Sequence, residues 1–126
     1  MRLILDSGAL IALERRDRAM WRRFKSALLA ARVPLSHGGV VGQVWRGRGP
    51  RQALLAQALG GIEVVAIDGA LGRAAGELLA RSAGNDVIDA ALVLLADDGD
   101  QIVTSDVSEL VPLASASGRH VEICPT

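Results

Sequence analysis

The sequence predicts an α/β domain in which helices cover both faces of a parallel β-sheet. Short apolar segments alternate along the chain with segments whose apolar residues recur at helical spacing, and this alternation is typical of parallel sheets. Two of the apolar segments end abruptly in an aspartate, at Asp6 and Asp106. Because ligands of such sheets bind outside the carboxyl ends of the strands, a functional site is expected at that edge.

Length and composition indicate one globular domain spanning residues 1–126. Half of the residues are apolar, which predicts a packed core rather than disorder. The single cysteine, Cys124, excludes an internal disulfide and favours a reducing compartment. Met1 and Arg2 lead directly into the first strand, which argues against a signal peptide. No apolar run reaches the roughly 18 residues of a membrane span, so a cytoplasmic protein is expected.

Charge is unevenly distributed although the formal net charge is zero. Eleven of the fourteen basic residues lie in residues 1–51, and eleven of the fourteen acidic residues lie after them. This split suggests a basic surface for nucleic acid or an acidic partner, with a separate acidic pocket. Folding could equally scatter the charges again, and the sequence leaves both interpretations open.

The first half of the chain begins with a buried strand, and Asp6-Ser7 forms a good helix cap after it. Helical spacing continues through Met20, Phe24 and Ala27, opposite a basic face that is either solvated or faces a partner. The expected elements are a strand at 2–5, helices at 8–15 and 17–31, a strand at 33–36, a helical segment at 40–45 and a helix at 51–59.

The segment at 40–45 is a poor autonomous helix because glycines surround it. Packing must hold it, and Trp45 is the expected anchor. His37-Gly38-Gly39 before it is expected to be a turn. The loop at 46–50 lacks the lysine and the spacing of a phosphate-binding motif, so a glycine-rich cofactor site is not expected.

The second half contains a helix that is apolar all round, which predicts burial on most sides. Asp89 lies within it, and a carboxylate there is costly unless it is paired or bound to a ligand. The expected elements are strands at 62–67, 101–105 and 121–123, with helices after Asp68, at 86–97 and after Asp106.

Five acids are candidates for one site: Asp6, Asp86, Asp89, Asp106 and Glu109. Asp86 and Asp89 share a helix face by their spacing, although several of the five can also be simple helix caps. Two carboxylates about 4 Å apart repel by roughly 4 kcal/mol at an effective dielectric near 20, so a cluster needs a cation or protons. Oxygen ligands suit Mg²⁺ or Mn²⁺.

Zinc is not expected, because His37 and His120 have no ligand spacing with another histidine or with a cysteine.

Three segments together resemble the PIN-domain family, and most closely the VapC toxins of bacterial toxin–antitoxin pairs. They are residues 3–10 around Asp6, residues 85–91 around Asp89, and residues 103–106 ending at Asp106. The resemblance covers essentially the whole chain. It implies a three-layer α/β/α sandwich with a five-stranded parallel sheet in the order 3-2-1-4-5, which places the first and fourth strands side by side.

The resemblance also implies roles for individual residues. Asp6, Asp89 and Asp106 would bind Mg²⁺ or Mn²⁺, and Gln43 occupies the position of a further catalytic acid that is usually glutamate in the family. That difference removes one negative charge and puts a second metal in doubt. Asp86 and Glu109 are accessory candidates, and Ser7 and Thr104 could orient an acid or contact phosphate.

The expected function is that of a Mg²⁺- or Mn²⁺-dependent endoribonuclease, a hydrolase acting as the toxin of a type II toxin–antitoxin pair. Arg15, Arg16, Arg46 and Arg48 would hold the backbone of single-stranded RNA or a loop. The few aromatic residues, Trp21, Phe24 and Trp45, are expected in the core. A VapB-like antitoxin that places an arginine among the acids, and a second copy of the chain, are the partners that the resemblance implies.

The alternative is a PIN-fold module that binds a protein or RNA with little catalysis, and Gln43 motivates it. A receiver-like pocket is excluded because the only lysine is Lys25, and a haloacid-type phosphatase is excluded because Asp6-Ser7-Gly8 lacks the second aspartate.

Overall fold

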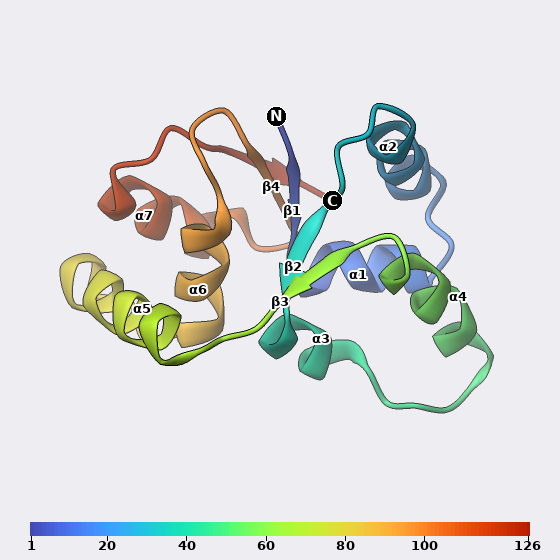
Figure 1. Ribbon diagram of the computed structural model, residues 1–126, viewed down its shortest axis with the longest axis horizontal. Coiled ribbons are helices and arrows are strands. Elements are labelled where there is room, and N and C mark those ends of the chain that lie inside the picture. The colour runs from blue at the N-terminus through green and yellow to red at the C-terminus, as the bar shows by residue number, and fades with distance from the viewer.

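The computed structural model describes residues 1–126, and in it five parallel strands form one sheet between two layers of helices (Figure 1). The strand order is β3-β2-β1-β4-β5. The predicted α/β/α sandwich and its strand order are therefore confirmed, with β1 and β4 side by side. The strands are β1 (Leu3–Leu5), β2 (Leu35–His37), β3 (Glu63–Val65), β4 (Gln101–Thr104) and β5 (Glu122–Pro125).

The helices divide between the two faces of the sheet in chain order (Figure 1). One layer holds α1 (Ser7–Glu14), α2 (Arg18–Leu29), α3 (Gly38–Val44) and α4 (Pro50–Leu59). The other holds α5 (Gly69–Ser82), α6 (Val87–Leu95) and α7 (Val107–Ser117). No helix is both long and apolar enough to cross a membrane.

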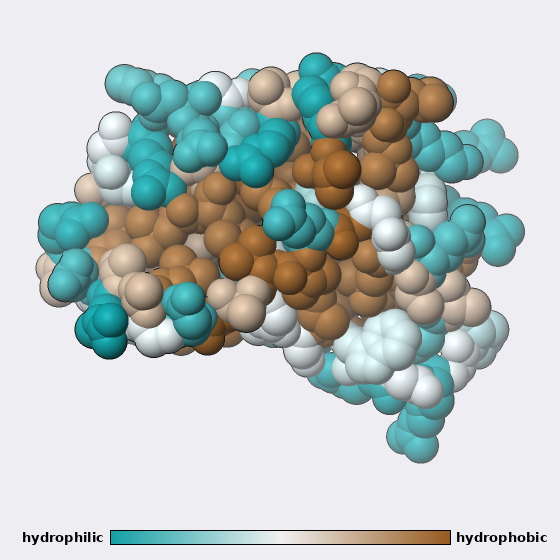
Figure 2. Space-filling model, viewed as in Figure 1, coloured by the Kyte–Doolittle hydropathy of each residue, from teal (hydrophilic) through white to brown (hydrophobic).

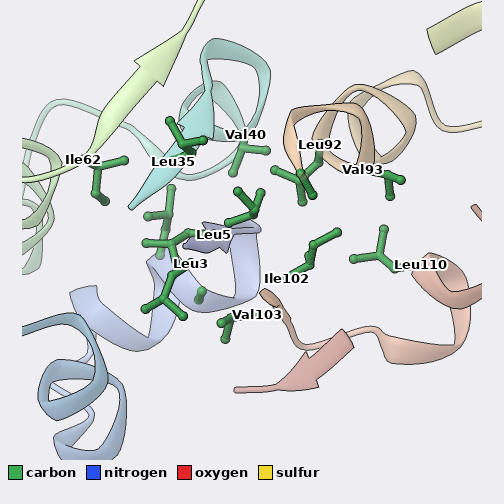
Figure 3. Close-up of a cluster of buried hydrophobic side chains, with 14 of the residues drawn as sticks. Leu3, Leu5, Leu35, Val40, Ile62, Leu92, Val93, Ile102, Val103 and Leu110 are labelled. Carbon is green, nitrogen blue, oxygen red and sulfur yellow. The ribbon is translucent and has the colours of Figure 1, made fainter. Parts of the chain in front are cut away.

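The core lies on both faces of the central strands, as Figure 3 shows. β1 is buried along its whole length, with Ile4 in register with Leu35 of β2 and Ile102 of β4. A strand covered on both faces has no solvated side, which is why β1 is continuously apolar rather than alternating. This burial fixes where β1 ends, and so where Asp6 emerges.

The prediction that Trp45 anchors α3 is wrong. The helix ends at Val44, Trp45 adopts an extended conformation, and the residue is 40% exposed. Val40 and Val44 are buried instead and provide the apolar contact. The core assignment of the aromatic residues holds for Phe24, which packs edge-on against a half-buried Trp21, and fails for Trp45.

Several boundaries also differ from the sequence-based expectation. β2 begins at Leu35, β3 is confined to Glu63–Val65, and α6 ends at Leu95. Strand pairing explains the shorter β3, because only residues opposite Leu35–His37 are in register with it. His37 is the last residue of β2 and not part of a turn.

The charge asymmetry of the sequence persists in space. Residues 7–59, which include α1–α4, contain ten basic and two acidic residues. Residues 69–117, which include α5–α7, contain two basic and eight acidic ones, three of which, Asp97, Asp98 and Asp100, lie in the connection between α6 and β4. The only ion pairs within 4.0 Å join Arg2 to Asp97 and Asp100. Folding therefore keeps the two kinds of charge apart, in agreement with the interpretation of a basic surface and a separate acidic pocket.

An apolar area crosses the middle of the face shown in Figure 2, where Figure 1 places the edge strand β3 and its connection to α5. Val64 of β3 and Ile67 after it are among the exposed large apolar residues.

Candidate functional site

Asp6 is held rigidly at the carboxyl end of β1. Its Oδ1 accepts a hydrogen bond from the backbone N–H of Ser7 (2.6 Å), and its Oδ2 accepts one from the Thr104 hydroxyl (2.7 Å). The residue is only 6% exposed. Thr104 also accepts a hydrogen bond from the backbone N–H of Asp106 (2.9 Å). Thr104 therefore links the two aspartates that end β1 and β4.

The close approach of α1 to the end of β4 depends on Gly8. A Cβ atom at this position would lie 2.3 Å from the Oγ and 2.8 Å from the backbone nitrogen of Ser105. Only glycine fits such a contact, since real Cβ atoms do not come this close to a backbone atom. The lack of a side chain at Gly8 thus allows the first turn of α1, which follows Asp6, to pack against the segment that carries Asp106.

The start of α6 places two further acids at this edge. Asp86 caps the helix by accepting hydrogen bonds from the backbone N–H groups of Ile88 (2.9 Å) and Asp89 (3.2 Å). Partial burial raises the pKa of Asp89 from 3.8 to about 7, with further contributions from the negative charges of Asp86, Asp6, Glu109 and Asp106. The other four candidate acids therefore all act electrostatically on Asp89.

An open pocket of about 230 Å³ lies beside these acids, between the α5–α6 connection and α7. Asp86, Asp89 and Glu109 line it. Asp106 is exposed and accepts a hydrogen bond from the Ser108 hydroxyl (3.2 Å). The pocket is thus an acidic hollow, open to solvent, and Asp6 and Asp106 do not line it.

The acids have the chemistry of a Mg²⁺ or Mn²⁺ site but do not form a closed one. No three histidine, cysteine, aspartate or glutamate side chains converge as a group that could hold a metal ion. The candidate donors are all carboxylate oxygens, which these hard cations prefer. A cation among them would also relieve the repulsion that, after burial, contributes to the raised pKa of Asp89. The donor set therefore fits such a cation, which would require the exposed carboxylates to turn inward.

Gln43 lies exposed on α3, and its side chain makes no hydrogen bond to the protein. Its backbone carbonyl accepts one from Arg46, whose guanidinium also donates to the carbonyls of Gly42 and Trp45. Arg46 therefore caps the end of α3. Arg48 is exposed in the following loop.

Arg15 and Arg16 follow the last turn of α1, whereas Asp6 precedes its first turn. Roughly 12 Å of helix separates the two ends, so the structure does not bring these arginines beside the acids. They lie instead with Arg51 around a separate hollow between α1 and α4.

His37, which is not among the site residues predicted from the sequence, is fully buried at the end of β2. It caps α3 and also contacts α6. Burial lowers its pKa, against the raising effects of its hydrogen bond to Ile88 and of the nearby Asp6 and Asp86 charges. Its position between a short strand and two glycines could have indicated a helix cap. Histidine is not a preferred capping residue, so the sequence favoured a turn instead.

No protein-family model and no curated protein matches this chain by sequence. Its fold is similar to a chain in the crystal structure of VapBC2 from Rickettsia felis bound to a DNA fragment from their promoter. The TM-score is 0.69 at 14% sequence identity, and the match covers 98% of each chain. At this identity the similarity establishes the fold alone, and it does so over the whole domain.

The pKa of Asp89 predicts how stability changes with pH in the metal-free protein. Between about pH 4 and pH 7 the folded chain keeps a proton on Asp89 that the unfolded chain has lost. The contribution of Asp89 to the free energy of unfolding should therefore fall as pH rises through this window. Buried His37, whose pKa is lowered, contributes a rise with pH that wild type and the Asp89 variant share. Asp89→Asn should remove the contribution of Asp89 and be more stable than wild type at pH 8.

Urea denaturation at pH 5 and pH 8 measures this effect. Glu77→Gln is a suitable control, because Glu77 is exposed on α5 and makes no hydrogen bond or ion pair. It should leave the pH dependence unchanged. Equal slopes for wild type and Asp89→Asn would show that Asp89 titrates like an ordinary carboxyl group.

Proposed function

We propose that this protein is a Mg²⁺- or Mn²⁺-dependent endoribonuclease and the toxin of a type II toxin–antitoxin pair. The observation that carries the proposal is the gathering of acids from β1, α6 and the end of β4. Burial of Asp89, together with the negative charges of the other acids, raises its pKa to about 7. The fold shared with a chain of a VapBC2 assembly supports the same assignment.

Each acid has a distinct part in this proposal. Asp6, fixed by Ser7 and Thr104, supplies a preoriented carboxylate. Asp89 and the exposed Asp106 complete the ligand set, with Asp86 and Glu109 at its rim. A bound Mg²⁺ or Mn²⁺ supplies Lewis acidity, which polarises the phosphate and lowers the pKa of an attacking water.

The proposed substrate is single-stranded RNA, which the basic layer would attract through its backbone phosphates. Arg48 lies in the loop after the helix of Gln43, and Arg15 and Arg16 lie farther along the same layer. Exposed Trp45 adds an aromatic surface in this region, and aromatic side chains stack on unpaired bases.

A VapB-like antitoxin is the proposed protein partner. The Rickettsia felis neighbour was crystallised as a VapBC2 assembly. An arginine placed by such a partner among the acids would neutralise them for the same reason as a metal ion. Homodimerisation is also proposed, and it is tested by the mass of the purified chain in solution.

RNA cleavage measured with and without EDTA tests the proposed activity. The purified chain should cut a labelled single-stranded RNA in Mg²⁺ or Mn²⁺, lose this activity in EDTA, and regain it when the metal is restored. Matched DNA of the same sequence serves as the substrate control. Cleavage that continues undiminished in EDTA would contradict the proposal.

Gln43→Glu should strengthen Mn²⁺ binding. The substitution adds a negative charge to an exposed side chain that no protein group holds in place, at the position where the family resemblance implies a further acid. An affinity gain of about tenfold corresponds to about 1.4 kcal/mol of added attraction. Isothermal titration calorimetry measures it, with Gln57→Glu on α4 as a control for net charge. Equal affinities for wild type and Gln43→Glu would place Gln43 outside the site.

The alternative function is a PIN-fold binding module with little catalysis. The absence of three converging ligands and the neutral Gln43 favour it. Calorimetry separates the two functions, since a module should bind RNA or a partner protein without binding Mn²⁺ at millimolar concentration.

A further inference from the structure

His37 makes three hydrogen bonds although it is completely buried. Its Nδ1 accepts from the backbone N–H groups of Gly39 (3.0 Å) and Val40 (3.3 Å), which cap the start of α3. Nδ1 must therefore be unprotonated, which leaves the ring proton on Nε2. Nε2 then donates to the backbone carbonyl of Ile88 in α6 (2.9 Å). The ring is thus a neutral imidazole with both nitrogens engaged.

These bonds join two helices that belong to different layers. β2 ends at His37, α3 follows it directly, and α6 packs on the other side of the sheet (Figure 1). Ile88 is the residue before Asp89, in the first turn of α6. The imidazole therefore connects the helix that carries Gln43 to the turn that carries Asp89.

Gly39 shows that the contact is close. A Cβ atom there would lie 2.4 Å from Cδ1 of Ile88 and 3.0 Å from Cε1 of His37. The first turn of α3 thus lies directly against Ile88, with no space for a side chain between them. Packing and hydrogen bonding hold the two helix starts together at the same point.

We propose that His37 is a positioning residue, which fixes the first turn of α6, and with it the Asp89 carboxylate, relative to α3 and Gln43. The role of His37 in metal binding rests on the proposed function, which this inference deepens. A partner that only orients a ligand can change metal affinity by about 10-fold to 100-fold. A core histidine without this role would affect stability alone.

Two substitutions test the hydrogen bonds of Nδ1 and of Nε2 separately. In His37→Asn the side-chain oxygen lies at the position of Nδ1 and can still cap α3, but the side chain is too short to reach Ile88. In His37→Gln the terminal amide reaches the position of Nε2 and can donate to Ile88, while the cap is lost. Leu55→Ala, in the buried part of α4, provides a control that destabilises the fold elsewhere.

The experiment measures Mn²⁺ affinity by calorimetry and amide hydrogen exchange by NMR on the full chain. Each variant is measured at the same interval below its own melting temperature, so that differences in stability do not affect the comparison. His37→Asn should weaken Mn²⁺ binding about tenfold and speed exchange in the first turn of α6. His37→Gln should stay within about threefold of wild-type affinity but expose the amides of Gly39 and Val40. Leu55→Ala should leave the affinity unchanged.

Equal Mn²⁺ affinities for His37→Asn and Leu55→Ala would overturn the positioning role. If the wild-type chain binds no Mn²⁺, the proposed function fails, and exchange then decides the role of His37. Faster exchange in α6 for His37→Asn but not for His37→Gln supports it. Equal acceleration of α3 and α6 in both variants overturns it.

Discussion

Asp6→Asn is expected to reduce RNA cleavage at least about 100-fold, equivalent to losing about 2.7 kcal/mol of transition-state stabilisation. The variant keeps the shape of the side chain, and its oxygen can still accept the hydrogen bond from the N–H of Ser7. The Thr104 hydroxyl can rotate to accept from the new amide. What is lost is the negative charge of the most buried acid of the site, so activity should fall far more than stability.

Asp68→Asn is the matched control for this prediction. Asp68 also caps a helix, accepting a hydrogen bond from the backbone N–H of Leu71 (2.8 Å), but it is exposed at the start of α5. Both variants should unfold at similar temperatures, and only Asp6→Asn should lose activity in a single-turnover cleavage assay. If Asp6→Asn retains a tenth or more of the wild-type rate, Asp6 does not have the proposed role.

Gly8→Ala is expected to destabilise the fold by about 1–3 kcal/mol, the usual cost of an overpacked contact. The Ser105 hydroxyl can rotate away from the added methyl group, but the backbone nitrogen of Ser105 at 2.8 Å cannot. The first turn of α1 must therefore move away from the end of β4. That movement separates Asp6 from Thr104 and should also reduce RNA cleavage.

Gly76→Ala is the opposite case and serves as its control. Gly76 lies within α5, and nothing lies within 4 Å of the position a Cβ would take. The change should stabilise the protein by up to about 1 kcal/mol through helix propensity. Urea denaturation of the two variants measures both effects. A shift of both midpoints in the same direction would show that Gly8 is not required for the close approach.

The layered α/β fold could be predicted because it depends on local pattern. Helical spacing and short apolar runs identified each helix and strand, although pairing with neighbours moved the ends of β2 and β3. The strand order came from the resemblance to the PIN-domain family and is confirmed. Periodicity could not supply the strand order. It shows which face of a helix or strand is apolar, but not which other element covers that face.

Trp45 and His37 show where local pattern fails. Trp45 fits the helical spacing of Val40 and Val44, yet α3 ends one residue earlier and leaves it exposed. His37 stands before two glycines and has the appearance of a turn residue. Its burial depends on Ile88, which is 51 positions away in the sequence.

The sequence by itself determined the α/β class, the acids at the ends of the first and fourth strands, and the separation of basic from acidic residues. These are properties of neighbouring residues and of composition. Only the tertiary structure decided that Thr104 links Asp6 to Asp106, that Gly8 permits this contact, and that Asp89 titrates near pH 7. Each depends on distances between distant segments, which exist only once the chain has packed.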